Sequence, residues 1–285
     1  MKSCKHCHQS IADDALFCLA CGQSQVADDE DLLIGKVIAG RYLIREKIGG
    51  GGSGTVYLAR HVTLQKKMAV KVLHHHLCTD DAAVERFRRE ATTMASIDNE
   101  HIIGVQDFGR ADDGRLYLAM ELLRGRTLAA LLAETSPLPI GRALAIFNQI
   151  VDALTEAHDQ GYVHRDLRPA NLFLTDKRGQ ADFVKVMDFG LSKLILNELE
   201  PGQATVGMNF GDPRYLSPEQ AAGEAVDRRT DIYSMAVVLY EMLCGQAPFT
   251  GDDVFAVINQ HLRVKPSPPS GLNPRLPTAF DDVLL

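Results

Sequence analysis

The sequence predicts an α+β protein of two lobes, a small strand-rich lobe followed by a larger helical lobe, with a small cysteine-rich module in front. Four of the six cysteines fall within the first 21 residues. Runs rich in β-branched and aromatic residues follow Arg41, and helical periodicity begins near residue 141. With 285 residues, 46% of them hydrophobic and 24% charged, the chain is long enough for two cores.

The net charge of −7 argues against nucleic acid as the main ligand. A duplex-binding surface has to neutralise several phosphates with clustered lysine and arginine. No stretch reaches the roughly 20 apolar residues that a membrane span needs, since the run from Ile232 to Tyr240 is broken by Glu241. The N-terminus also lacks the apolar run of a secretory signal. We therefore expect a cytoplasmic protein with no membrane segment and no nucleic-acid ligand.

The clustered cysteines predict a structural Zn²⁺ site. The pairs Cys4-x-x-Cys7 and Cys18-x-x-Cys21 have the spacing that tetrahedral four-thiolate zinc requires. A module this short buries too little apolar surface to fold alone, so the metal would supply most of its folding free energy. Two disulfides are disfavoured by the missing signal peptide, and a redox dithiol by the missing βαβ pattern.

The same segment resembles the zinc-ribbon modules of many bacterial proteins. We expect residues 1–24 to form this ribbon, either as a structural part or as the site for a protein partner. Residues 25–40, which contain Asp28-Asp-Glu-Asp31, are typical of an acidic linker.

A glycine-rich turn predicts a phosphate-binding loop. A strand that begins at Tyr42 leads into the sequence GGGGSG, in which the spaced glycines are Gly49, Gly51 and Gly54. Glycine has no Cβ, so backbone N–H groups there can approach phosphate oxygens. This pattern is weak evidence by itself. A dinucleotide-binding fold is excluded by context, because it needs a helix after the third glycine and here a strand continues to Ala59.

Lys71 lies inside a later predicted strand, residues 68–73, among apolar neighbours. A lysine in this setting is usually an exposed edge residue unless a carboxylate balances it. The helix predicted for residues 81–96 places Glu90 beside its inward apolar face. The sequence therefore predicts a Lys71–Glu90 ion pair.

An ordered set of polar motifs follows the helix predicted for residues 141–160, which ends at Gly161. The motifs are His164-Arg165-Asp166 with Asn171 five residues after the aspartate, then Asp188-Phe189-Gly190, then Ser217-Pro218-Glu219. With the glycine loop, Lys71 and Glu90 in the same order, the chain resembles the protein kinases from about residue 33 onward. The loop from Leu167 to Asn171 is most similar to the Ser/Thr class, as found in the bacterial members of the eukaryotic-like Ser/Thr kinases.

This resemblance implies a bilobal protein kinase-like fold, with a β-rich N-lobe over residues 41–124 and a helical C-lobe over 125–285 that is incomplete at its C-terminal end. It also implies transfer of the ATP γ-phosphate to Ser or Thr hydroxyls of protein substrates, with autophosphorylation. Arg165 beside Asp166 is a positive charge that family members often balance with a phosphorylated activation loop. Thr205 is the leading candidate for that phosphate, because Ser192 and Ser217 lie too close to the motifs on either side.

The resemblance further assigns roles to single residues. Asp166 is expected to accept or orient the proton of the substrate hydroxyl. Lys71, oriented by Glu90, would hold the α and β phosphates. Asn171 and Asp188 would hold Mg²⁺, with Mn²⁺ as a substitute.

The nucleotide would lie between the glycine loop and the C-lobe. The adenine ring is expected between Val56 and Ala69 on one side and Phe173 on the other, and the loop that follows Ile48 would cover the phosphates. The hinge supplies the remaining contacts, namely the gatekeeper Met120, the carbonyl of Glu121 and the N–H of Leu123.

Two departures from the family pattern stand out. Arg168 replaces the usual lysine of the catalytic loop, and Asp212 replaces a threonine that usually contacts that lysine. We expect a charge-assisted Arg168–Asp212 pair. In the family, Glu219 normally pairs with an arginine in later helices, so we also expect it to be a buried carboxylate without its partner.

Two alternatives remain at this point. The chain could be a pseudokinase scaffold that binds nucleotide and signals through protein contacts, or the zinc ribbon could be the functional part with the kinase as its regulator. The complete set of polar catalytic positions favours an enzyme.

Overall fold

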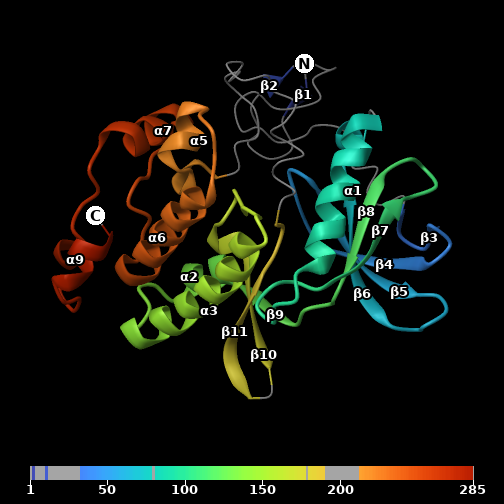
Figure 1. Ribbon diagram of the computed structural model, residues 1–285, viewed down its shortest axis with the longest axis horizontal. Coiled ribbons are helices and arrows are strands. Elements are labelled where there is room, and N and C mark those ends of the chain that lie inside the picture. Colours follow the sequence, from blue (N-terminus) through green and yellow to red (C-terminus); the bar gives the residue numbers. More distant parts are fainter. Residues whose placement is uncertain are drawn as a thin grey trace.

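The structure is a computed structural model that describes residues 2–3, 10–11, 33–78, 81–177, 179–189 and 212–284 (Figure 1). Near the N-terminus, β1 (Lys2–Ser3) pairs antiparallel with β2 (Ser10–Ile11). The four predicted zinc ligands, Cys4, Cys7, Cys18 and Cys21, lie outside the described residues, as does Thr205. The zinc site and the phosphorylation site therefore stay predictions.

The first lobe is built on an antiparallel sheet. Its strands are β3 (Val37–Ile38), β4 (Tyr42–Gly51), β5 (Gly54–His61), β6 (Lys67–Leu73), β7 (Val105–Arg110) and β8 (Leu116–Met120). They are arranged in the order β3-β4-β5-β6-β8-β7. Consecutive strands from β3 to β6 are neighbours, which is the arrangement that short hairpin connections allow.

One helix of this lobe, α1 (Asp81–Ser96), packs against the sheet beside β7 (Figure 1). Its bounds are those that the sequence predicts. Phe87, Ala91 and Met94 are buried on the inward face, and Glu90 is buried with them at 7% exposure. The 3.6-residue periodicity was sufficient here because the helix has one partner surface and therefore one apolar face.

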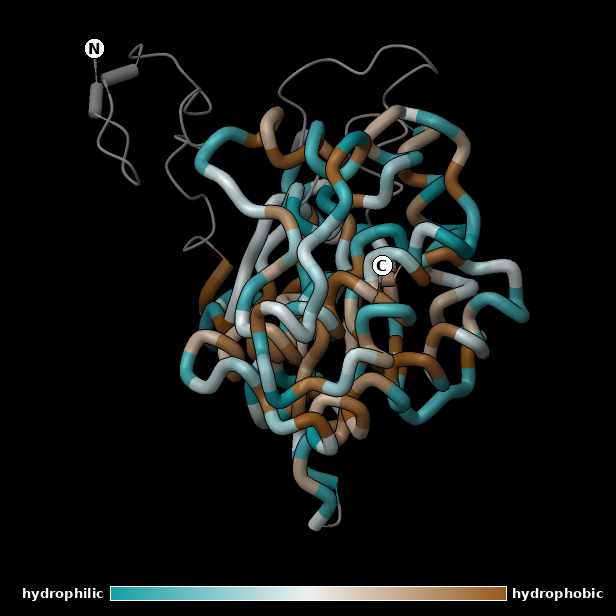
Figure 2. Tube along the Cα trace, turned by 90° about the vertical axis from the view of Figure 1, so that its left-hand side faces the viewer, coloured by the Kyte–Doolittle hydropathy of each residue, from teal (hydrophilic) through white to brown (hydrophobic). Residues whose placement is uncertain are grey.

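The second lobe is mainly helical. Its helices are α2 (Leu128–Glu134), α3 (Ile140–Asp159), α5 (Pro218–Ala222), α6 (Arg228–Cys244), α7 (Val254–Arg263), α8 (Pro269–Leu272) and α9 (Ala279–Leu284). A three-stranded sheet of β9 (Gly125–Thr127), β10 (Leu172–Lys177) and β11 (Gln180–Val186) lies beside α2 and α3 (Figure 1). The β10–β11 hairpin projects from the body of the molecule, and Figure 2 shows hydrophilic residues at its tip. None of the described helices is both long enough and apolar enough to cross a lipid bilayer.

Helix α3 has a broad buried side. Ile150, Leu154 and Ala157 are buried, as are Ala143 and Ile146, whereas Leu144 and Phe147 are only partly buried. The helix is covered by α6 on one side and by β11 on another, so its apolar face is wider than a single stripe.

A single large core joins the lobes. It contains Ala69 and Leu118 from the sheet of the first lobe together with Leu128, Ile150 and Val238 from the second. A backbone bridge between Ile102 and Val186 also crosses between the lobes. The contacts between the lobes are therefore part of the packed interior.

Gly54 permits a close approach of β5 to β6. A Cβ on this residue would lie 2.3 Å from the Val72 carbonyl oxygen. We expect Gly54→Ala to lower the free energy of unfolding by about 2 kcal/mol, as overpacking against fixed backbone does. Urea denaturation of the full chain measures this change. Gly52→Ala, at a residue where a Cβ would meet nothing within 4 Å, is the matched control; equal stability of the two variants would contradict the prediction.

Candidate active site

A buried carboxylate holds the loop that follows α3. Asp231 on α6 is completely buried, accepts hydrogen bonds from the N–H groups of His164 (2.7 Å) and Arg165 (2.8 Å), and lies 2.8 Å from His158 Nε2. Gln220 Nε2 donates to the carbonyl of Arg165 at 2.8 Å. Arg165 has φ of +69°, a conformation that a side chain with Cβ adopts only when its surroundings impose it. These contacts fix the backbone that carries the next residue.

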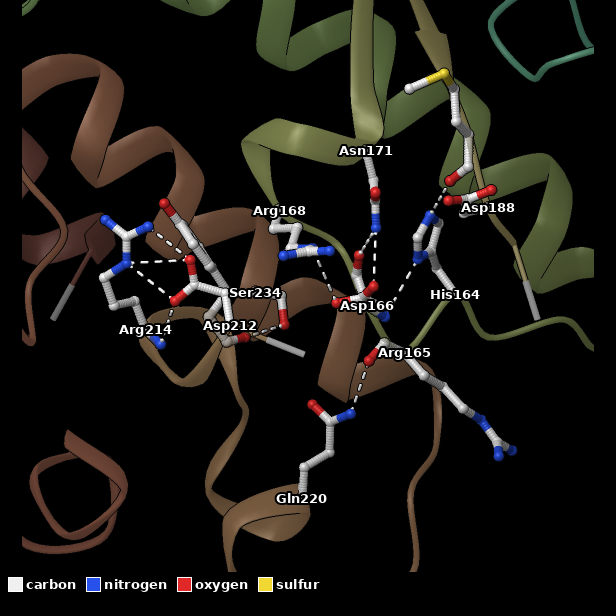
Figure 3. A network of polar contacts seen from close by, with 12 residues as sticks. His164, Arg165, Asp166, Arg168, Asn171, Asp188, Asp212, Arg214, Gln220 and Ser234 are labelled. Atoms are coloured by element: carbon white, nitrogen blue, oxygen red, sulfur yellow. Dashed lines mark hydrogen bonds and ion pairs between the residues drawn. The ribbon is translucent and has the colours of Figure 1, made fainter. Parts of the chain in front are cut away.

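That next residue is Asp166, and both of its carboxylate oxygens are contacted (Figure 3). Asn171 Nδ2 donates to Oδ2 at 2.9 Å and to the Asp166 carbonyl at 2.8 Å. Arg168 Nε lies 3.3 Å from Oδ1, an ion pair whose angle does not make it a hydrogen bond. The Asp166 side chain keeps 27% of its surface exposed, so an incoming hydroxyl can reach it.

Asp188 faces Lys71 across the site. The two side chains form an ion pair with Lys71 Nζ 2.8 Å from Asp188 Oδ2. Burial by itself would raise the pKa of Asp188, but the positive charge of Lys71 and its hydrogen bond hold that pKa below its ordinary value. His164 helps to fix this segment, since its Nε2 lies 2.8 Å from the Met187 carbonyl. Asp188 is therefore a carboxylate at neutral pH.

The predicted Lys71–Glu90 ion pair is wrong in this structure. Among the described residues, Lys71 makes its ion pair with Asp188, although Glu90 is buried on the inward face of α1 as expected. Asp188 lies beside Lys71 with a backbone φ of +62°, in the left-handed region that aspartate tolerates. A buried ammonium at 4% exposure needs one close counter-charge, and Asp188 supplies it.

The glycine-rich segment forms the β4–β5 hairpin. Gly49 pairs with Val56 and Gly51 with Gly54, so the tip consists of two residues. Val56 pairs in turn with Lys71 on β6, which places their side chains on the same face of the sheet. Ala69, two residues before Lys71, shares that face.

The segment after β8 has free hydrogen-bonding groups. Within the described chain, neither the carbonyl of Glu121 nor the N–H of Leu123 has a hydrogen-bond partner. The Glu121 side chain is fixed, because it pairs with Lys185 Nζ at 2.7 Å and accepts from the Gly104 N–H at 2.9 Å. Met120, immediately before it, is 6% exposed. An acceptor and a donor on neighbouring backbone groups fit the edge of an adenine ring.

The remaining predicted nucleotide contacts are Phe173 and Ile48, one strand residue from each lobe. Phe173 on β10 is half-buried and pairs with Lys185 on β11 and Thr127 on β9. Ile48 is 46% exposed at the base of the glycine hairpin. Both residues keep accessible surface, which contact with a ligand requires.

The predicted Arg168–Asp212 pair is also wrong. Asp212 instead binds Arg214, with Arg214 Nε 2.9 Å from Oδ1 and Nη2 2.6 Å from Oδ2 (Figure 3). Arg168 pairs with Asp166. Asp212 pairs with Arg214 and not with Arg168 because Arg214 is only two residues away, on the short turn η4 (Pro213–Tyr215). Pairing within one turn costs less conformational entropy than pairing with a side chain that is distant in sequence.

Glu219 does not behave as the sequence predicts either. The carboxylate is half-buried and accepts a hydrogen bond from Thr230 Oγ1, so the prediction of an unpaired buried carboxylate is wrong. The partner arises because α6 begins next to α5 and places its first turn against Glu219. A hydroxyl hydrogen bond satisfies the carboxylate without a second buried charge.

The donor set fits a hard divalent cation. Asn171 uses its Nδ2 toward Asp166, which directs its Oδ1 elsewhere, and Asp188 offers a second carboxylate oxygen beside the one that Lys71 contacts. Amide and carboxylate oxygens are the ligands that Mg²⁺ prefers. No group of three or more His, Cys, Asp or Glu capable of holding a metal occurs in the described ranges. Two protein oxygens suffice where phosphate oxygens complete the shell.

The sequence did not predict three residues of the site, namely Asp231, Arg214 and Lys185. Asp231 had a usable signal, since it opens a largely apolar helical run, and an aspartate buried in a helix needs hydrogen-bond donors around it. Arg214 had a weaker one, because an arginine two residues after an aspartate in a Pro-containing turn can pair locally. Lys185 had none, as its partner lies on another lobe.

Residues 42–274 match the family model described as "Protein kinase domain". The chain is 40% identical to the serine/threonine-protein kinase pkn3 of Myxococcus xanthus over 261 residues. This match covers 90% of the chain and 48% of pkn3. It is 37% identical to PrkC of Bacillus subtilis, over 89% of this chain and 38% of PrkC. The chain thus spans about half or less of the curated relatives it matches.

A solved structure has a similar fold. The crystal structure of the Mycobacterium tuberculosis PknI kinase domain superposes with a TM-score of 0.67 at 30% identity, covering 88% of this chain and 87% of that one. Together with the family match over most of its length, this shows that the chain belongs to the protein kinase domain family.

Proposed function

We propose that this chain is an ATP-dependent protein kinase that phosphorylates Ser and Thr hydroxyls of protein substrates. The observation that carries the proposal is a set of contacts: Asn171 donates to Asp166, and Lys71 pairs with Asp188. The N–H of Met187, next to Asp188, donates to the carbonyl of Asn171 at 2.9 Å and so connects the two pairs. The bacterial relatives named as Ser/Thr protein kinases support it.

ATP with Mg²⁺ supplies the transferable phosphoryl group and neutralises part of its charge. Asp166, which contacts Asn171 and Arg168, would orient the acceptor hydroxyl and take its proton. Lys71 would attract the phosphates with a buried charge that acts through a low dielectric. The free backbone groups of Glu121 and Leu123 would select adenine.

One observation favours a second candidate, a nucleotide-binding scaffold without transfer activity. Lys71 engages Asp188, and this ion pair offsets part of the charge that each group would offer to phosphates or to a cation. The ammonium keeps further donors and the carboxylate a second oxygen, so both groups can still bind a ligand. The complete catalytic set therefore keeps the enzyme as the main proposal, and a transfer assay separates the two.

For residues 1–24 we propose a zinc ribbon that holds structural Zn²⁺ through Cys4, Cys7, Cys18 and Cys21. The pairing of β1 with β2 supports it, because residues 4–9, which contain the first cysteine pair, then connect two antiparallel strands. A protein partner for this ribbon and a cytoplasmic location, where the thiols stay reduced, belong to the same proposal.

Asp166→Asn is expected to lower the rate of phosphate transfer from ATP to a generic protein substrate by about 1000-fold, because an amide cannot accept the proton. Labelled ATP measures the transfer, and thermal unfolding checks that the fold is kept. Asp159→Asn, at an exposed aspartate of α3, is the matched control and should keep wild-type activity. Activity of Asp166→Asn within tenfold of wild type would refute the role of base.

Autophosphorylation is expected at Thr205. After incubation of the full chain with ATP and Mg²⁺, mass spectrometry should find phosphate on this residue and none in the Asp166→Asn variant. The physical reason is the charge of Arg165 beside the catalytic aspartate, which a phosphate can balance. A fully active chain without phosphate on Thr205 would remove this residue from the proposal.

The ribbon is expected to bind one Zn²⁺ per chain. Metal analysis of the purified chain should show this stoichiometry, and Cys18→Ser should lose the metal because tetrahedral thiolate zinc needs its full set of ligands. Cys78→Ser, at a buried cysteine of the first lobe, is the control that should keep it. Equal metal content in the two variants would rule out the site.

A further inference from the structure

Two arginine–carboxylate pairs lie next to each other at the catalytic loop. Arg168 contacts Asp166 at 3.3 Å, and Arg214 holds both oxygens of Asp212 at 2.9 and 2.6 Å. Figure 3 shows Arg168 between Asp166 and the Asp212–Arg214 pair. The two pairs differ in quality, because only the second has the geometry of charge-assisted hydrogen bonds.

Arg168 is within electrostatic reach of both carboxylates. Burial would raise the pKa of Asp212, but the hydrogen bond from Arg214 and the charges of Arg214 and Arg168 hold that pKa below its ordinary value. The Nε of Arg168 is buried and has no hydrogen bond among the described residues. An arginine with an unsatisfied donor will turn toward whichever carboxylate offers a free oxygen.

Of the groups involved, Asp212 is held in place by its surroundings. It caps η4, with Oδ1 3.2 Å from the Arg214 N–H, and η4 is tied to α6 because Ser234 Oγ donates to the Tyr215 carbonyl at 2.8 Å. Arg168, in contrast, is a long side chain with 30% of its surface exposed. Any change of partner would therefore occur by movement of Arg168.

We propose that Arg214 is a positioning residue for catalysis: by occupying both oxygens of Asp212, it leaves Arg168 on Asp166. The inference rests on the proposed function, in which Asp166 orients the acceptor hydroxyl. With Arg168 on one oxygen and Asn171 on the other, the Asp166 carboxylate is fixed in one rotamer. Without Arg214, Asp212 captures Arg168, and the Asp166 side chain loses one of its two restraints.

The chain contains a matched control for this pair. Asp227 and Arg229 repeat the same arrangement, an aspartate that caps the next turn and binds the arginine two residues later, with Nη2 2.8 Å from Oδ2. Arg229 is 81% exposed, and Asp227 contacts no residue of the catalytic loop in the described chain. Arg229→Ala removes the same local contact without releasing a competitor for Arg168.

The kinetic test compares the full-length wild type with Arg214→Ala, Arg229→Ala and the double variant Asp212→Asn/Arg214→Ala. We expect Arg214→Ala to lower kcat about tenfold with little change in the KM for ATP. The double variant should recover to within about threefold of wild type, because a neutral amide no longer attracts Arg168. Arg229→Ala should equal wild type. Wild-type activity of Arg214→Ala, or no recovery in the double variant, would overturn the inference.

A structural readout makes the test independent of activity. A crystal structure of Arg214→Ala, or of Arg214→Gln if alanine prevents folding, should show the Arg168 guanidinium on Asp212. Arg168 still on Asp166 in that variant would overturn the inference. A wild-type chain without transfer activity would instead refute the proposed function, and the crystal structure would still decide where Arg168 goes.

Discussion

The geometry of the site depends on one buried charge, the carboxylate of Asp231. A fully buried carboxylate is costly unless all its neighbours are donors, and this one receives two backbone N–H groups of the catalytic loop and faces His158. Because much of α6 is buried, these bonds attach the catalytic loop to the packed interior of the second lobe. The unusual backbone of Arg165 is the local consequence, and it sets the direction in which Asp166 points.

Two ion pairs between the lobes form the rest of the site. Lys71 comes from the first lobe and Asp188 from the second, and their ion pair spans the place where phosphates would lie. Glu121 and Lys185 form a second pair across the lobes, next to the free backbone groups of the hinge. Both pairs are well shielded on the lysine side, at 4% and 12% exposure, so they are stronger than surface ion pairs.

The elements and the order of the catalytic residues could be predicted from the sequence, but the partners of the charged groups could not. The bounds of α1 followed from periodicity because that helix has one neighbour surface. Lys71 and Asp188 lie in different lobes, far apart in the sequence, so no local residue pattern pairs them. The width of the buried face of α3 has a similar origin, since it reflects two packing partners that are distant in sequence.

The Asp212–Arg214 pair shows how a chain can depart from its family pattern without losing the site. An aspartate in place of the usual threonine adds a negative charge near the Arg168–Asp166 pair. A local arginine two residues away neutralises that charge at little cost in conformational entropy. The same local pairing leaves Arg168 in contact with Asp166. The substitutions at Arg168 and Asp212 therefore do not compensate each other directly. Arg214, on the turn after Asp212, neutralises the added charge instead.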